Sequence, residues 1–80
     1  MHLYITGFLT DDHEDDSLKY DLHVVPEFEQ AVMDVLGWKS LVEESDGELP
    51  LTKHQIQEIV SVIKEPLPRD LDLFIGVVRD

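Results

Sequence analysis

The sequence predicts an α+β fold in which two helices pack on one face of a small antiparallel or mixed three-stranded sheet, in the order β-β-α-α-β. Three segments alternate with the two-residue period of strands, and two others repeat apolar residues with the period of a helix. The chain has 80 residues, which suits a single domain over residues 1–80, and 42% of them are hydrophobic. That apolar content is sufficient for folding despite a net charge of −12.

The first strand is expected at residues 2–9, HLYITGFL, which are rich in β-branched and aromatic side chains. Both of its alternating sets are largely apolar, which suits either a central strand covered on both faces or a twisted strand half-open to solvent. Residues 19–25, KYDLHVV, alternate as a second strand with one wetter face, paired antiparallel to the first. Residues 71–78, LDLFIGVV, predict a third strand, which should lie beside the first because both are apolar on two faces.

A first helix is expected to begin at Pro26, because proline is well tolerated at the first position of a helix. An apolar stripe at helical spacing follows, formed by Phe28, Val32, Val35 and Leu36. Gly37 is placed for a left-handed C-cap. Residues 38–50 have no clear period and allow a short helix or a bent extended segment.

A second helix is expected to follow Thr52, which has the spacing of a capping box with Gln55. Its buried stripe is formed by Ile56, Ile59, Val60 and Ile63. Pro66 stops the helix, because the residue before a proline is disfavoured in the helical conformation.

Residues 10–21, TDDHEDDSLKYD, hold six carboxylates and are a natural place to seek a metal or catalytic site. An EF-hand loop needs glycine at its position 6 and glutamate at its position 12. Counting from Asp12 places Ser17 and His23 at these positions, and the register that begins one residue earlier fails as well. Paired catalytic carboxylates need environments that push their pKa values apart, whereas an exposed loop gives all of them the same wet environment.

The remaining chemical signals also argue against an enzyme and against a bound metal or other cofactor. There is no cysteine, which excludes disulfides and thiolate metal sites. The four histidines form no HxxxH or HExxH pair; only His2 and His23, on neighbouring strands, could approach each other, and we expect ordinary strand histidines. No GxSxG, Walker or dinucleotide-binding glycine motif is present.

The negative charge is concentrated in the first three-fifths of the chain. Residues 1–49 carry 13 acids and 2 bases, whereas residues 50–80 carry 5 acids and 4 bases. Such a field repels nucleic acid and anionic membranes and attracts a basic protein, although a solvated surface that serves solubility is the alternative. Trp38 fits either the core or an interface. The candidate partner-binding residues are Asp11, Asp12, Glu14, Asp15, Asp16, Trp38, Glu43, Glu44, Asp46 and Glu48.

The stretches LPLTKHQIQEIVSVI and DLDLFIGVV resemble the helix-then-strand ending of some bacterial toxin immunity proteins, of the contact-dependent inhibition and bacteriocin systems. The resemblance implies a non-catalytic protein that neutralises a basic, nuclease-type toxin domain by direct binding. The lack of a signal-peptide pattern and of a membrane-spanning apolar run favours the cytoplasm. Two alternatives stay open, namely a nucleic-acid mimic that inhibits a DNA- or RNA-binding protein and a non-catalytic interaction domain.

Overall fold

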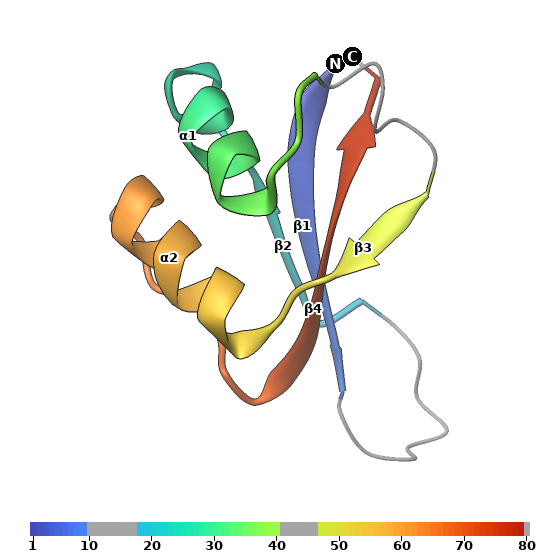
Figure 1. The fold of residues 1–80 in the computed structure, drawn as a ribbon. Coiled ribbons are helices and arrows are strands. Elements are labelled where there is room, and N and C mark those ends of the chain that lie inside the picture. The colour runs from blue at the N-terminus through green and yellow to red at the C-terminus, as the bar shows by residue number, and fades with distance from the viewer. Residues whose placement is uncertain (10–17, 41–46, 80) are drawn as a thin grey trace.

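The described residues fold as an α+β sandwich of two helices and a four-stranded antiparallel sheet, as shown in Figure 1. A computed structural model describes residues 1–9, 18–40 and 47–79. The elements follow in the order β1 (His2–Leu9), β2 (Tyr20–His23), α1 (Pro26–Leu36), β3 (Glu48–Pro50), α2 (Lys53–Ile63) and β4 (Leu71–Val78). The strand order in the sheet is β2-β1-β4-β3.

The two long strands, β1 and β4, form the centre of the sheet. They pair antiparallel along their whole length, from His2 opposite Val78 to Leu9 opposite Leu71. This arrangement confirms the prediction that the C-terminal strand lies beside the first. The shorter β2 pairs antiparallel with the other side of β1, where Ile5 lies opposite Leu22.

The predicted count of three strands is wrong, because residues 48–50 form a fourth strand at the edge beside β4. The order is therefore β-β-α-β-α-β. Of segment 38–50, for which the sequence allowed a short helix or an extended conformation, residues 48–50 are extended. A three-residue strand whose side chains are all exposed has no buried face, so it leaves no alternation in the sequence. It is held in place by pairing with β4, which is a tertiary effect.

The helix ends match the local signals in the sequence. Gly37 has a φ of 75°, and the backbone N–H groups of Gly37 and Trp38 donate to the carbonyls of Asp34 and Met33, which is a Schellman motif. At the start of α2 the capping box is complete, with Gln55 N–H donating to Thr52 Oγ1 at 3.1 Å and Thr52 N–H donating to Gln55 Oε1 at 2.9 Å. α2 ends at Ile63, three residues before Pro66.

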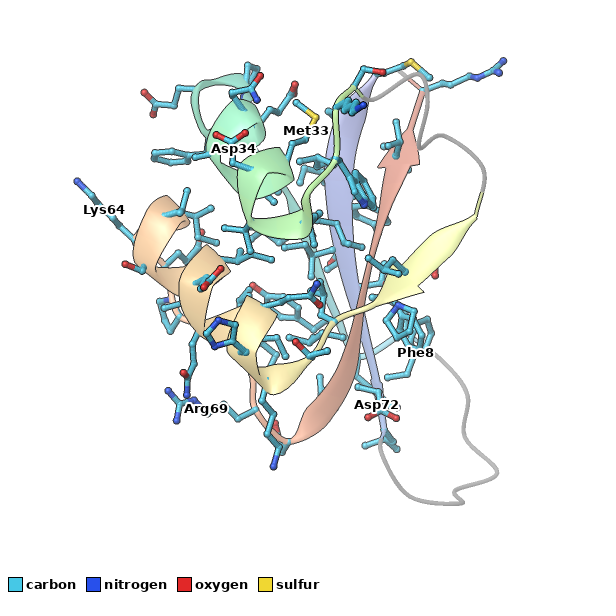
Figure 2. All side chains as sticks on the ribbon, in the orientation of Figure 1. Phe8, Met33, Asp34, Lys64, Arg69 and Asp72 are labelled. Atoms are coloured by element: carbon cyan, nitrogen blue, oxygen red, sulfur yellow. The ribbon has the colours of Figure 1, made fainter. Side chains whose placement is uncertain are left out.

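The hydrophobic core lies between the two helices and one face of the sheet (Figure 1). The buried hydrophobic residues come from the sheet (Leu3, Ile5, Leu73 and Ile75), from the segment between β2 and α1 (Val24), from the helices (Val32, Met33, Ile59 and Ile63) and from the loop before β4 (Leu67). Side chains fill this layer in Figure 2, whereas the labelled Phe8 and Asp72 point to the other side of the sheet. Of the two possibilities for the first strand, the half-open one therefore holds.

Candidate functional site: the uncovered face of the sheet

One face of the sheet has no helix packed on it in the part of the chain that the structure describes. Because residues directly opposite each other in antiparallel strands share a face, the pairings define its members. We call this surface the uncovered face. It consists of His2, Tyr4, Thr6 and Phe8 from β1, Asp21 and His23 from β2, Glu48 and Pro50 from β3, and Asp72, Phe74, Gly76 and Val78 from β4.

Aromatic rings form the apolar part of the uncovered face. Phe8 and Phe74 meet edge to face, with ring centroids 6.0 Å apart and planes at 71°. Tyr4 stacks on His23 with centroids 4.4 Å apart. The rings of Tyr4, Phe8 and Phe74 are half-buried by one another and by neighbouring strands, so part of each stays accessible to a partner.

Gly76 allows β3 to lie close to the centre of this face. A methyl group at its Cα would stand 3.1 Å from Cγ of Glu48 and 3.3 Å from the carbonyl oxygen of Gly47. Glycine at this position therefore permits the close pairing with β3 that places the Glu48 carboxylate beside the aromatic rings.

The charged residues of the uncovered face are all acidic. Asp21, Glu48 and Asp72 are exposed, and each belongs to a different strand. None of the four described strands contains lysine or arginine, since all six bases of the chain lie in helices, loops or the end of the chain. Lysine is a usual device for protecting exposed sheet edges from other chains, and β2 and β3 are edge strands without it.

A polar network joins the aromatic and acidic parts of the face. The Tyr4 hydroxyl donates a hydrogen bond to Asp21 Oδ2 at 3.2 Å. Partial burial, this hydrogen bond and the negative charges of Asp21 and Glu48 raise the pKa of Tyr4 above its usual value of 10.0. Thr6 on β1 lies opposite Asp21, and its hydroxyl is buried and has no hydrogen-bond partner among the described residues.

Most of the residues predicted to bind a partner lie outside the described residues. These are Asp11, Asp12, Glu14, Asp15, Asp16, Glu43, Glu44 and Asp46. Glu48 is exposed on the uncovered face, opposite Gly76. Trp38 is half-buried and packs against the hydrophobic core.

Among the residues of the uncovered face, sequence reasoning predicted only Glu48 as partner-binding and missed the other acidic residues and the aromatic rings, namely Tyr4, Phe8, Asp21, Asp72 and Phe74. The signal was present in the alternation of β1 and β4, whose second apolar set is formed largely by aromatic side chains. That set was compatible with a second buried layer, and only the position of both helices on the other face shows that it meets solvent.

No group of three or more histidine or acidic side chains close enough to hold a metal ion occurs among the described residues. None of the described helices is long and apolar enough to cross a membrane. Comparisons with protein families, with curated proteins and with solved structures found no match to this chain.

Proposed function

We propose that this protein is an acidic protein-binding inhibitor, an immunity protein that neutralises a basic, nuclease-type toxin by direct binding. The observation that carries the proposal is the uncovered face, which combines accessible aromatic rings with three carboxylates and has no lysine or arginine in its strands. An apolar centre with a polar rim is the usual anatomy of a protein interface. The acidic rim selects a basic partner.

Charge adds speed to this recognition. A net charge of −12 on a chain of 80 residues attracts a basic nuclease over a long range. Complementary charge raises association rates to about 10⁸–10⁹ per molar per second at low salt. Carboxylates that reach a phosphate-binding cleft then occupy the positions of the phosphates and exclude the substrate.

The size of the uncovered face indicates that more of the chain takes part. The four strands contain 8, 4, 3 and 8 residues, and at about 3.4 Å per residue and about 4.8 Å between strands the plane covers roughly 400 Å². A standard interface buries about 800 Å² on each partner. We propose that the acidic segments supply the remainder, because residues 10–17 join β1 to β2 and residues 41–46 precede β3. On this proposal the predicted acidic residues also contact the partner.

A growth-rescue assay tests the function. The chain is co-expressed with the toxin encoded next to it in the genome, and growth should be restored only when the chain is present. A variant with Asp21→Asn, Glu48→Gln and Asp72→Asn should rescue less well, associate more slowly with the purified toxin domain and show a flatter dependence of the association rate on salt.

A second triple variant separates the face from the net charge. Glu27→Gln, Glu65→Gln and Asp70→Asn remove the same charge from exposed positions in α1 and in the loop before β4. This variant should keep most of the rescue. Equal loss in the two variants would show that charge alone acts and would refute the uncovered face as the binding surface; no rescue by the natural sequence would refute the function.

A further inference from the structure

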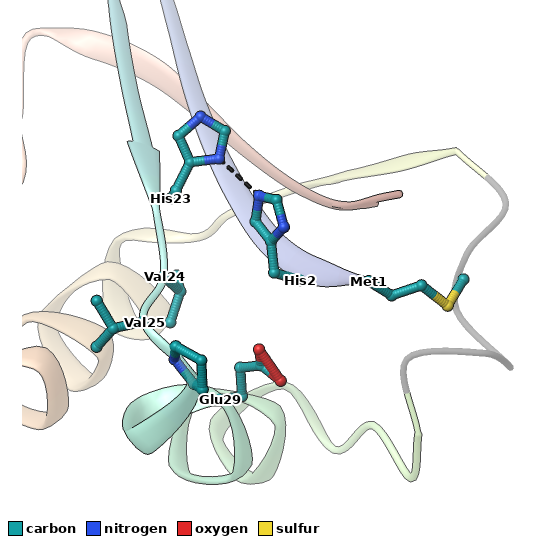
Figure 3. Close-up of a pocket in the computed structure, with 7 residues that line it drawn as sticks. Met1, His2, His23, Val24, Val25 and Glu29 are labelled. Carbon is teal, nitrogen blue, oxygen red and sulfur yellow. Dashed lines mark hydrogen bonds between the residues drawn. The ribbon is translucent and has the colours of Figure 1, made fainter. Parts of the chain in front are cut away.

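Two histidines meet at one end of the uncovered face. His2 Nε2 lies 2.6 Å from His23 Nδ1, and their ring centroids are 4.8 Å apart. His23 is paired with Tyr4, which lies two residues along β1 from His2, so the pairing of β1 with β2 holds the two histidines close together. Figure 3 shows the two rings facing each other beside a pocket that Glu29 of α1 also lines.

From this arrangement we propose that His2 and His23 form a two-histidine site for a divalent transition-metal ion, with Cu²⁺ preferred to Zn²⁺. Two imidazole nitrogens on one ion, each at about 2.0 Å, stand about 2.8 Å apart at a right angle and about 3.3 Å apart at the tetrahedral angle. The observed 2.6 Å is a hydrogen-bond distance, and it shows that the two nitrogens are close enough to share one ion after a small movement of the rings. Imidazole sites also bind Cu²⁺ more tightly than other first-row ions.

Metal binding requires a defined movement of one proton. In the neutral pair one ring nitrogen donates its hydrogen to the other, so a single proton lies between the two nitrogens. When the ion binds, this proton moves to the far nitrogen of the ring that carried it, and each near nitrogen offers its lone pair to the metal. Both rings stay neutral, and no net proton is released.

Among the described residues, no third histidine or acidic side chain completes a cluster, so the two rings are the ligands that this part of the chain supplies. Both strands present the ligands before the metal arrives, so the second histidine acts at a high effective concentration. Loss of either ring should therefore weaken binding by at least about tenfold.

Titration calorimetry of the folded chain with CuCl₂ and with ZnCl₂, in a buffer that does not bind metals, tests the site. One Cu²⁺ should bind per chain, more tightly than Zn²⁺, and His2→Gln and His23→Gln should each weaken Cu²⁺ binding at least tenfold. Far-ultraviolet circular dichroism confirms that each variant is folded. In the Cu²⁺ complex, electron paramagnetic resonance should show two nitrogen ligands from imidazole, reduced to one in either variant.

The other two histidines supply matched controls. His54→Gln removes an exposed ring that pairs with Glu58 on α2, and His13→Gln removes the ring of the acidic segment. Both controls should bind Cu²⁺ as the natural sequence does. The proposal is overturned if His13→Gln or His54→Gln abolishes binding, if His2→Gln alone weakens it while His23→Gln does not, or if no Cu²⁺ binds.

Discussion

The two tyrosines of the chain report the negative charge around the sheet at the scale of single residues. Burial raises the pKa of Tyr20, as it does that of Tyr4, and the charges of Glu65 and Asp21 add to the effect. The charge of Asp21 thus acts on both rings, whereas that of Glu65 acts on Tyr20.

We predict that both phenols ionise above pH 10.0 in the folded chain. Asp21→Asn should lower the pKa of both rings, and Glu65→Gln should lower that of Tyr20 alone. Because the neutral phenol is favoured in the folded state, the associated stability is complete below the unfolded pKa and is lost as the pH rises through the folded pKa. Titration of the ring resonances by nuclear magnetic resonance, with circular dichroism to verify folding, provides the measurement. If Tyr4 titrates at the same pH in the Asp21→Asn variant as in the natural sequence, the hydrogen bond between Tyr4 and Asp21 is contradicted.

At the scale of elements, the end of α2 contains a conformation that lysine adopts at a cost. Lys64 has a φ of 57° and is the one residue other than glycine with a positive φ in the described chain. Its N–H donates to the carbonyl of Val60 at 2.9 Å, so the left-handed conformation caps the helix. For a residue with a Cβ, this conformation costs about 1–2 kcal/mol.

Lys64→Gly should therefore increase the free energy of unfolding by about 0.5–1 kcal/mol, the remainder being offset by the greater freedom of glycine in the unfolded chain. Urea unfolding of the two proteins measures the difference. Lys64→Ala is the control, because it removes the same charge and retains the Cβ. If the alanine variant gains as much stability as the glycine variant, backbone strain is not the cause.

The elements differ in how far the sequence could predict them. α2 was predictable because Thr52 and Gln55 specify its start and four apolar residues specify its buried side. β1 and β4 were predictable from alternation, as was their pairing. β3 was not, because its three residues are exposed and include Pro50, so pairing with β4 alone makes it a strand.

The candidate site was less predictable than the fold, for a reason that lies in the layers of the whole molecule. The distribution of charge predicted a partner-binding site in the acidic segments, which can be recognised in the sequence as clusters of carboxylates. Tyr4, Phe8 and Phe74 become a surface only because α1 and α2 both cover the opposite face. A sequence with two apolar faces on its central strands fits a two-layer or a three-layer structure, and the layer count decides whether the second set of rings is core or binding surface.

The distribution of charge also affects the stability of the whole molecule. Its dimensions are 35 × 25 × 18 Å, comparable with the Debye length of about 30 Å at 0.01 M salt. At low salt, most of the 18 carboxylates therefore repel one another, and 9 of them lie in residues 10–17, 41–46 and 80, which contain no lysine or arginine. Folding brings these charges closer together than they are in the extended chain, so repulsion opposes the folded state.

We predict that the free energy of unfolding, measured with urea, rises as NaCl increases from 0.01 to 0.15 M, because the Debye length falls to about 8 Å. Changing Asp11, Asp12, Asp15 and Asp16 to asparagine should raise stability at 0.01 M and reduce the response to salt. The triple variant Glu27→Gln, Glu65→Gln and Asp70→Asn serves for comparison, because it removes charge from exposed positions that are scattered in the sequence. A larger gain per charge in the first variant is expected, because Glu27 lies in the first turn of α1 and its replacement loses a favourable interaction with the helix dipole. If the natural sequence is equally stable at both salt concentrations, repulsion among the carboxylates does not destabilise the folded state. The excess of acidic residues then needs no binding role to explain it.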